Sequence, residues 1–91
     1  MQKQMTCTVS GRVQMVMYRD FTCRRARALG LTGWVKNNDD GTVTVVAEGE
    51  EDVLRELLSF LHSGSMLSRV DDVRSAWKEP SGSFSSFSIV Y

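Results

Sequence analysis

Polar and apolar residues alternate near both ends of the chain. Residues 5–10 read Met-Thr-Cys-Thr-Val-Ser, with every second side chain apolar, and Phe87, Ile89 and Tyr91 repeat this spacing near the other end. Alternation of this kind is typical of a β-strand that buries one face. We therefore predict a first strand over residues 5–10 and a last strand over residues 84–91.

Two segments have the spacing of helices instead. Apolar and small residues recur every three or four positions over residues 18–29, which predicts a helix with one buried face. A stronger stripe follows the acidic residues 50–52, whose charge suits a helix start, and predicts a second helix that ends near His62. The first stripe consists of Tyr18, Thr22, Ala26 and Leu29, and the second of Val53, Leu54, Leu57, Leu58 and Leu61.

The middle of the chain has the pattern of a β-hairpin. Residues 31–37 and 42–47 hold β-branched and aromatic side chains, and residues 38–41 (Asn-Asp-Asp-Gly) between them are typical of a tight turn. We expect Gly49 to end the second of these strands. A further strand is predicted over residues 70–78.

The predicted order of elements is β-α-β-β-α-β-β. Two helices that each follow a strand, with a hairpin between them, fit a split βαβ arrangement. We therefore expect an α+β fold, the ferredoxin-like sandwich, with one mostly antiparallel sheet and both helices on one face. The 91 residues fit a single domain, residues 1–91. Many functions use this fold, so the fold by itself decides none of them.

The chain has no formal net charge, with 11 basic and 11 acidic residues. This balance argues against a dedicated nucleic-acid binder, whose affinity comes largely from Lys and Arg on phosphates. The charge is unevenly distributed, because residues 1–45 hold seven basic and three acidic side chains, whereas residues 46–91 hold four and eight. The first half can therefore supply an anion-attracting region.

The remaining single residues predict little chemistry of their own. The first ten residues contain no apolar export segment, and no apolar run has the length of a membrane span, so we expect a cytoplasmic location. Cys7 and Cys23 then stay reduced, and we expect Cys7 to be buried and Cys23 to flank the core face of the first helix. We expect Trp34 to be a core residue. His62 is the only histidine, so we expect no metal site.

The segment between the first strand and the first helix has the features of an anion-binding site. Residues 11–16 run into a helix N-terminus, where free backbone N–H groups and the helix dipole favour an anion. Arg19, in the first turn, can hold a phosphate through two parallel hydrogen bonds. Asn37 ends the next strand, and its amide can orient a water molecule. Arginines at helix starts are also commonly solvated and asparagines are common before turns, so these residues alone leave both interpretations open.

The order of residues in this region resembles that of one protein family. Residues 11–19 (Gly-Arg-Val-Gln-Met-Val-Met-Tyr-Arg) are similar to the acylphosphatase signature G-x-V-Q-G-V-x-F/Y-R, and residues 29–37 match the family's L-G-L-x-G-W-V-x-N. Residues 40–43 (Asp-Gly-Thr-Val) and 87–91 (Phe-Ser-Ile-Val-Tyr) also resemble the family. The resemblance covers nearly the whole chain, in order.

This resemblance implies a hydrolase that cleaves the carboxyl–phosphate anhydride of acyl phosphates into a carboxylate and phosphate. By resemblance, Arg19 and Asn37 are the catalytic residues, Arg19 binding the phosphate and Asn37 positioning the attacking water. The 11–16 loop would cradle the phosphate through its backbone amides. The family pattern implies a small-molecule acyl phosphate as substrate, no metal or organic cofactor, and a monomer. From the charge balance and the lack of a long apolar run we expect no nucleic acid and no membrane as partner. The phosphate-binding residues that it implies are Arg12, Val13, Gln14, Met15, Val16 and Arg19.

Such a mechanism fits the residues present. His62 and both cysteines lie outside the matched motifs, so nothing indicates a Ser-His-Asp or Cys-His nucleophile. An acyl phosphate has a good carboxylate leaving group, and positioning plus charge stabilisation carries most of phosphoryl transfer. Our hypothesis is that the substrate's own phosphate accepts the proton.

One residue departs from the family pattern, because Met15 stands where the family has glycine. Glycine allows positive φ and close approach of a ligand to the backbone. If the position needs left-handed geometry, a side chain there costs about 1–2 kcal/mol, whereas at negative φ it points outward without strain. We expect a tolerated change. The alternative is a catalytically impaired ferredoxin-like module that binds an anion or a protein.

An RNA-binding module of the related βαββαβ type is the third possibility. Such modules stack bases on aromatic side chains of the sheet. The strand predicted over residues 42–47 has no aromatic residue, and the expected basic-aromatic string is absent. The sequence therefore argues against this function.

Overall fold

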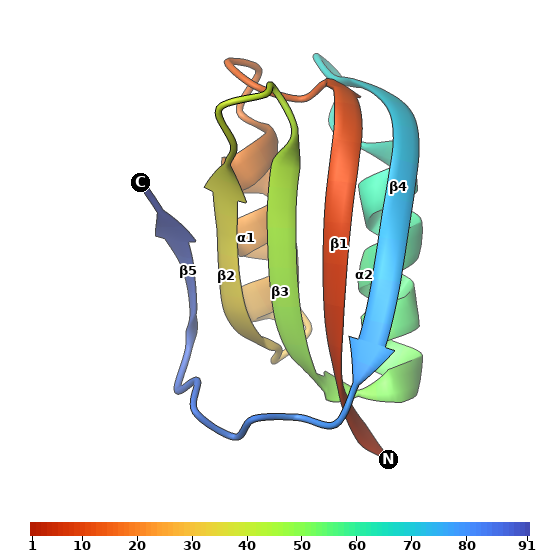
Figure 1. The fold of residues 1–91 in the computed structure, drawn as a ribbon, viewed down its shortest axis with the longest axis vertical. Coiled ribbons are helices and arrows are strands. Elements are labelled where there is room, and N and C mark those ends of the chain that lie inside the picture. Colours follow the sequence, from red (N-terminus) through yellow and green to blue (C-terminus); the bar gives the residue numbers. More distant parts are fainter.

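The computed structural model describes residues 1–91 as two helices and a five-stranded sheet, in the predicted order (Figure 1). Neither helix is long and apolar enough to cross a membrane. The elements are β1 (Gln2–Arg12), α1 (Tyr18–Ala28), β2 (Thr32–Asn37), β3 (Val43–Glu50), α2 (Glu51–Ser63), β4 (Arg69–Lys78) and β5 (Phe87–Val90).

The strands follow the spatial order β4-β1-β3-β2-β5. β1 pairs antiparallel with β3 and β4, and β2 pairs antiparallel with β3. β5 is the exception, because it runs parallel to β2. Both helices lie against one face of the sheet and leave the other face uncovered (Figure 1). The predicted α+β ferredoxin-like sandwich is confirmed.

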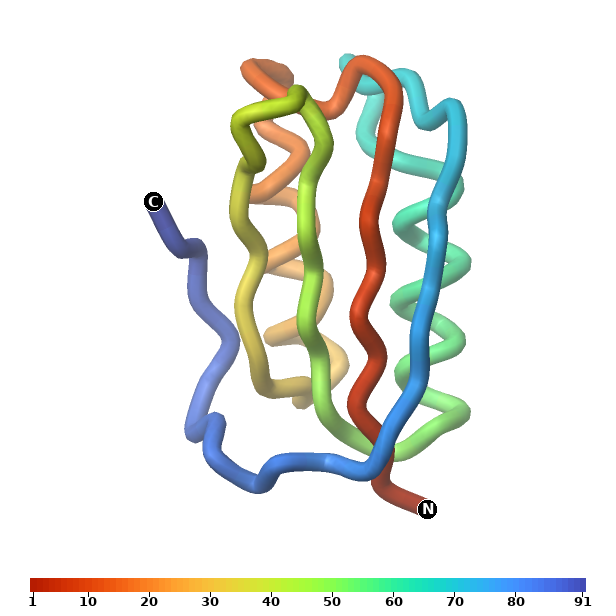
Figure 2. Tube along the Cα trace, viewed as in Figure 1, coloured from red at the N-terminus to blue at the C-terminus, as the bar shows by residue number.

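The connection from β4 to β5 brings the end of the chain to the site. β4 and β5 form opposite edges of the sheet, so residues 79–86 cross beneath one end of it (Figure 2). β5 then runs in the same direction as β2, toward the end of the sheet that carries the β2–β3 turn and the β1–α1 connection (Figure 2). Residues 87–91 are therefore directed toward the predicted anion site.

The core fills the space between the sheet and the two helices. β1 and β3 contribute cross-strand pairs such as Cys7 and Val45, and α2 contributes its leucine stripe. The Tyr18 hydroxyl donates a 2.8 Å hydrogen bond to the Leu61 carbonyl oxygen, which ties the first turn of α1 to the end of α2. Side chains with no exposed surface include Met5, Cys7, Val9, Val35, Val43, Val45, Leu54, Leu57 and Leu61.

Both cysteines are free and buried, as predicted. Cys7 belongs to the core, and burial raises its pKa to about 12. The Cys23 sulfur lies 3.8 Å from the carbonyl oxygen of Phe87, where α1 packs against β5. Neither thiol is positioned as a nucleophile.

The prediction that Gly49 ends a strand is wrong. β3 continues through Gly49 to Glu50, and Gly49 pairs with Lys3 of β1. A side chain at Gly49 would collide with the side chain of Leu31. The glycine therefore permits close packing within the strand rather than terminating it.

Two further predictions differ from the structure. Trp34 is half-buried and lies outside the core. Side chains alternate along β2, so Trp34 and its strand partner Val46 lie on the face of the sheet opposite to that of the buried Val35. β5 spans Phe87–Val90 and is shorter than the strand predicted over residues 84–91.

The crossing segment before β5 is held by a buried carboxylate. Glu48 accepts hydrogen bonds from the N–H groups of Ser81 (2.7 Å) and Gly82 (3.1 Å), from the Ser81 hydroxyl (2.8 Å) and from the side-chain amide of Gln4 (2.6 Å). Burial raises the pKa of Glu48, but these hydrogen bonds outweigh it and hold the pKa at about 2. An ionised Glu48 thus fixes the path that leads into β5.

Candidate active site

The connection between β1 and α1 consists of residues 13–17, which we call the site loop. It lies at the same end of the sheet as the β2–β3 turn (Figure 1). The side-chain amide of Gln14 donates hydrogen bonds to the carbonyl oxygens of Asn38 (2.8 Å) and Thr42 (2.9 Å). Gln14 therefore fastens the site loop to the turn that follows Asn37.

The backbone N–H groups from Val13 to Asp20 are free, because none of them donates a hydrogen bond to another protein group. Within this stretch Met15 and Met17 have positive φ, 61° and 63°, so the chain coils tightly as it enters α1. Successive free N–H groups in such a coil, at a helix N-terminus, form a concavity that attracts anions.

Arg19 adds a full positive charge beside these amides. Its guanidinium carbon lies 5.1 Å from the centre of the Tyr91 ring, and it forms no ion pair with a carboxylate. The neighbouring Asp20 is paired instead with Arg24, at 3.1 Å. The planar guanidinium of Arg19 is therefore free to bind a planar or tetrahedral anion through its fork of N–H donors.

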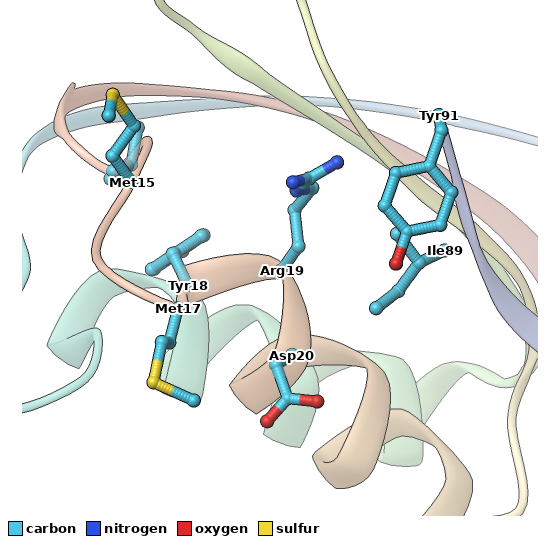
Figure 3. A pocket seen from close by; sticks show the side chains of 8 residues that line it. Met15, Met17, Tyr18, Arg19, Asp20, Ile89 and Tyr91 are labelled. Carbon is cyan, nitrogen blue, oxygen red and sulfur yellow. The ribbon is translucent and has the colours of Figure 1, made fainter.

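These groups open into one cavity of about 540 Å³. Figure 3 shows Arg19 between the methionines of the site loop on one side and Ile89 and Tyr91 on the other. The wall is mostly apolar, with Arg19 as its only basic and Asp20 as its only acidic side chain. The lining residues are Val13, Met15, Met17, Tyr18, Arg19, Asp20, Ile89 and Tyr91.

Asn37 lies at the end of β2, next to this region but not in the cavity wall. Lys36 pairs with Val90 of β5, so Asn37 and Tyr91 each come one residue after a paired position. The Asn37 Oδ1 atom is buried and has no hydrogen-bond partner. An orphaned amide oxygen of this kind is costly unless a ligand or water donates to it.

The structure brings some of the predicted site residues together and separates others. Val13, Met15 and Arg19 line the cavity. Arg12 is exposed at the end of β1, where it pairs with Arg69 of β4. Val16 points into the core, so only its backbone can face a ligand at the site loop.

Met15 has both the left-handed backbone and the outward-pointing side chain that the sequence analysis treated as alternatives. Its φ of 61° lies in the left-handed region, so the unstrained alternative does not apply. Its side chain is nevertheless 99% exposed and leaves the space over the backbone free. Met17 has the same backbone geometry, which nothing in its sequence position predicted.

Sequence reasoning missed the contacts that join the site loop and its cavity to distant segments. Ile89 and Tyr91 line the cavity because β5 pairs parallel with β2, a pairing that spans most of the chain. Gln14 was expected only as part of the loop, whereas its side chain bridges to the turn. The shared face of Ile89 and Tyr91 was a usable signal, but it did not indicate what that face contacts.

The titratable side chains in the wall do not provide an obvious proton acceptor. The Tyr18 hydroxyl is bonded to a backbone carbonyl, and its burial raises its pKa. Asp20 is held by Arg24. No histidine or cysteine lines the cavity. This arrangement suits binding, orientation and charge stabilisation rather than nucleophilic catalysis by a side chain.

Known proteins resemble this chain along nearly its whole length. The acylphosphatase family model matches residues 5–89. The acylphosphatase of Salinibacter ruber is 41% identical over 88 residues, covering 97% of this chain and 93% of the relative. That of Arthrobacter sp. (strain FB24) is 47% identical over 83 residues, covering 91% and 76%. The crystal structure of the Bacillus subtilis acylphosphatase is 39% identical, with a TM-score of 0.94 and coverage of 98% and 99%. Sequence and fold agree, and the chain belongs to the acylphosphatase family.

Proposed function

We propose that this chain hydrolyses acyl phosphates to a carboxylate and inorganic phosphate. The oxygen of water forms a bond to phosphorus, and the bond between phosphorus and the acyl oxygen breaks with its electron pair leaving on the carboxylate. The observation that carries this proposal is the run of free N–H groups from Val13 to Asp20 beside the unpaired guanidinium of Arg19. Together they match the negative oxygens of a phosphoryl group.

Arg19 binds the phosphoryl oxygens and stabilises the charge that develops on them. Its position in the first turn of α1 places the guanidinium next to the free amides of the site loop. Preorganised donors of this kind stabilise charge without rearranging during the reaction. Tyr91 restricts the guanidinium from the opposite side.

Asn37 orients the attacking water. Its place at the end of β2 supports this role, because the site loop bonds the backbone of the next residue, Asn38, and an amide oxygen that accepts a hydrogen bond from a water O–H directs the water's lone pair. The proton that the water loses passes to an oxygen of the substrate's own phosphoryl group, which becomes inorganic phosphate when the carboxylate leaves. A carboxylate leaving group needs no proton, so the reaction balances without a protein base.

Hydrolysis of acetyl phosphate by the purified chain tests the function. Removing the guanidinium by Arg19→Ala should lower kcat/KM by about 100-fold or more, as losing a key charge-stabilising donor does in other sites. Arg25→Ala removes an exposed arginine of the same helix and serves as the matched control. Near-normal turnover by Arg19→Ala, or no turnover by the unmodified chain, would refute the proposal.

The role of Asn37 has a different kinetic signature. Asn37→Ala should lower kcat at nearly unchanged KM, because a water orienter contributes only during the chemical step. Asn38→Ala changes the next asparagine, which holds the turn by bonding Thr42 and Thr44. A rise in KM without a fall in kcat for Asn37→Ala would assign Asn37 to substrate binding instead.

We also propose a cytoplasmic monomer. Arg19, the free amides of the site loop and Asn37 belong to one chain, so the proposed chemistry is complete without a second copy. The two free thiols suit a reducing compartment. Sedimentation velocity at assay concentrations should give the mass of one chain, and a stable dimer would contradict the monomer.

A further inference from the structure

The cavity around Arg19 is far more apolar than phosphate binding requires. Phosphate needs positive charge and N–H donors, which Arg19 and the site-loop backbone provide. The rest of the wall presents methionine, isoleucine and tyrosine side chains, with Met15 and Met17 on one side of Arg19 and Ile89 and Tyr91 on the other (Figure 3). This apolar part continues directly from the anion site.

Three of these side chains are held out in solvent. Met15 is 99% exposed, Met17 is 59% exposed and Tyr91 is 89% exposed. Exposed apolar surface gains free energy only when something covers it. Here the surface surrounds the group that binds the phosphate, so the group covalently attached to that phosphate is its natural occupant.

The size of the cavity supports an occupant larger than an acetyl group. The cavity, of about 540 Å³ and open to solvent on one side, has room for an acyl group larger than acetyl beside the phosphate. The phosphate end uses only the backbone and Arg19. Methionine side chains adapt to ligands of varied shape, so this wall suits a range of apolar groups rather than one shape.

The charges of the cavity disfavour an acyl group with a second negative charge. Arg19 is the only basic lining residue, and the phosphate takes it. Arg24, further along α1, is already paired with Asp20. A second carboxylate would therefore meet Asp20 and apolar side chains without a partner.

We propose, on the basis of the proposed function, that the preferred substrates carry an apolar acyl group, aliphatic or aromatic, which packs against Met15, Met17 and Tyr91. Met15 is then a specificity residue of this particular chain, where the family pattern has no side chain at all. Its left-handed backbone displays the side chain at the cavity rim without filling the phosphate cradle.

Competing substrates test this preference directly. The kcat/KM values for acetyl, hexanoyl, benzoyl and succinyl phosphate are measured under one set of conditions. A fully buried methylene contributes about 0.8 kcal/mol, so partial burial of four methylenes should raise kcat/KM for hexanoyl over acetyl phosphate about tenfold or more. Succinyl phosphate should fall below acetyl phosphate. A hexanoyl-to-acetyl ratio below twofold overturns the proposal.

Variants of Met15 separate side-chain contact from backbone strain. Met15→Asn removes the apolar side chain but tolerates positive φ, and should lower the hexanoyl-to-acetyl ratio at least threefold. Met15→Leu keeps an apolar side chain and should preserve the ratio. Met66→Asn makes the same change at a methionine that is 96% exposed but lies outside the cavity, and should leave the ratio unchanged.

The ratio is informative because effects common to all substrates cancel in it. Any change in phosphate binding or water orientation alters both substrates equally. A ratio in Met15→Asn equal to that of the unmodified chain overturns the role of Met15. Hydrolysis of every substrate at similar rates refutes this inference alone, whereas no hydrolysis of any of them refutes the proposed function.

Discussion

The guanidinium carbon of Arg19 lies 5.1 Å from the centre of the Tyr91 ring (Figure 3). The two residues belong to segments far apart in the chain, which meet because β5 pairs parallel with β2 and also packs against α1. An exposed cation–π contact contributes about 0.5–1 kcal/mol, which is small for folding but sufficient to bias one flexible side chain. The contact therefore restricts Arg19 while leaving its N–H donors free for an anion.

Replacing Tyr91 should weaken anion binding. In Tyr91→Leu the guanidinium loses its aromatic partner, and the inhibition constant for inorganic phosphate should rise about two- to fivefold. Tyr91→Phe keeps the ring and serves as the matched control. Phosphate is the proper probe because it has no acyl group, so it reports only on the anion site. Equal inhibition constants for Tyr91→Leu and Tyr91→Phe would show that the contact does not influence Arg19.

Gln14 should matter for both stability and activity. In Gln14→Ala the carbonyl oxygens of Asn38 and Thr42 each lose one of two donors and keep only a backbone N–H, from Gly41 and Asn38 respectively. The loss of two hydrogen bonds should lower the free energy of unfolding by about 1–3 kcal/mol. The site loop is also released from the β2–β3 turn, so kcat/KM should fall. Urea denaturation and acetyl phosphate hydrolysis measure the two effects.

A matched change shows whether the effect is specific to that bridge. Gln2→Ala removes another side-chain amide, one that bonds the exposed Glu50 at the far end of β1. It should change the free energy of unfolding by less than about 0.5 kcal/mol. If Gln14→Ala and Gln2→Ala lower the free energy of unfolding and kcat/KM by the same amounts, the bridge from the site loop to the turn does not contribute more than an exposed hydrogen bond.

The parts of this fold that sequence reasoning predicted depend on local patterns. The leucine stripe of α2 and the alternation of β1 are visible in consecutive residues, because side-chain spacing alone decides which face is buried. Arg19 and the site loop were candidates for the same reason, since loop and helix N-terminus are adjacent in the chain, but their assignment to a phosphate site came from the resemblance to the acylphosphatase signature.

The parts that failed depend on partners that the sequence does not identify. Gly49 looked like a strand terminator, but its role is to make room for Leu31. Trp34 looked like a core residue, but the register of β2 turns it to the uncovered face of the sheet. In both cases the deciding contact comes from another element, and the residue's own type pointed the other way.

Acid should weaken the fold through Glu48. Its pKa is about 2 in the folded chain, against 4.5 for an unperturbed glutamate, so the unfolded chain binds the proton more readily. The stabilisation from ionised Glu48 is therefore complete above pH 4.5 and is lost as the pH falls from about 4.5 to about 2. The free energy of unfolding, measured by urea titration at several pH values, should decline across this window.

Glu48→Gln identifies the carboxylate responsible. The variant should flatten the pH dependence in that window and lower the free energy of unfolding at neutral pH by about 1–3 kcal/mol, because an amide cannot accept all of the same hydrogen bonds. Glu56→Gln changes an exposed glutamate of α2 and is the control. An unaltered pH profile in Glu48→Gln would show that other carboxylates cause the acid sensitivity.

Glycine at position 15 should stabilise the chain. Met15 has a φ of 61°, where a side chain costs about 1–2 kcal/mol, and glycine removes that cost while adding about 0.4–1 kcal/mol of unfolded-state entropy. The free energy of unfolding of Met15→Gly should therefore rise by about 0.5–1 kcal/mol in urea titrations. Met15→Ala keeps the β-carbon, and with it the strain, so it should gain nothing. An equal gain in both variants would show that the methionine side chain, rather than the left-handed backbone, destabilises this loop. A rise in kcat of more than tenfold in Met15→Gly would contradict the tolerance that the exposed side chain of Met15 supports.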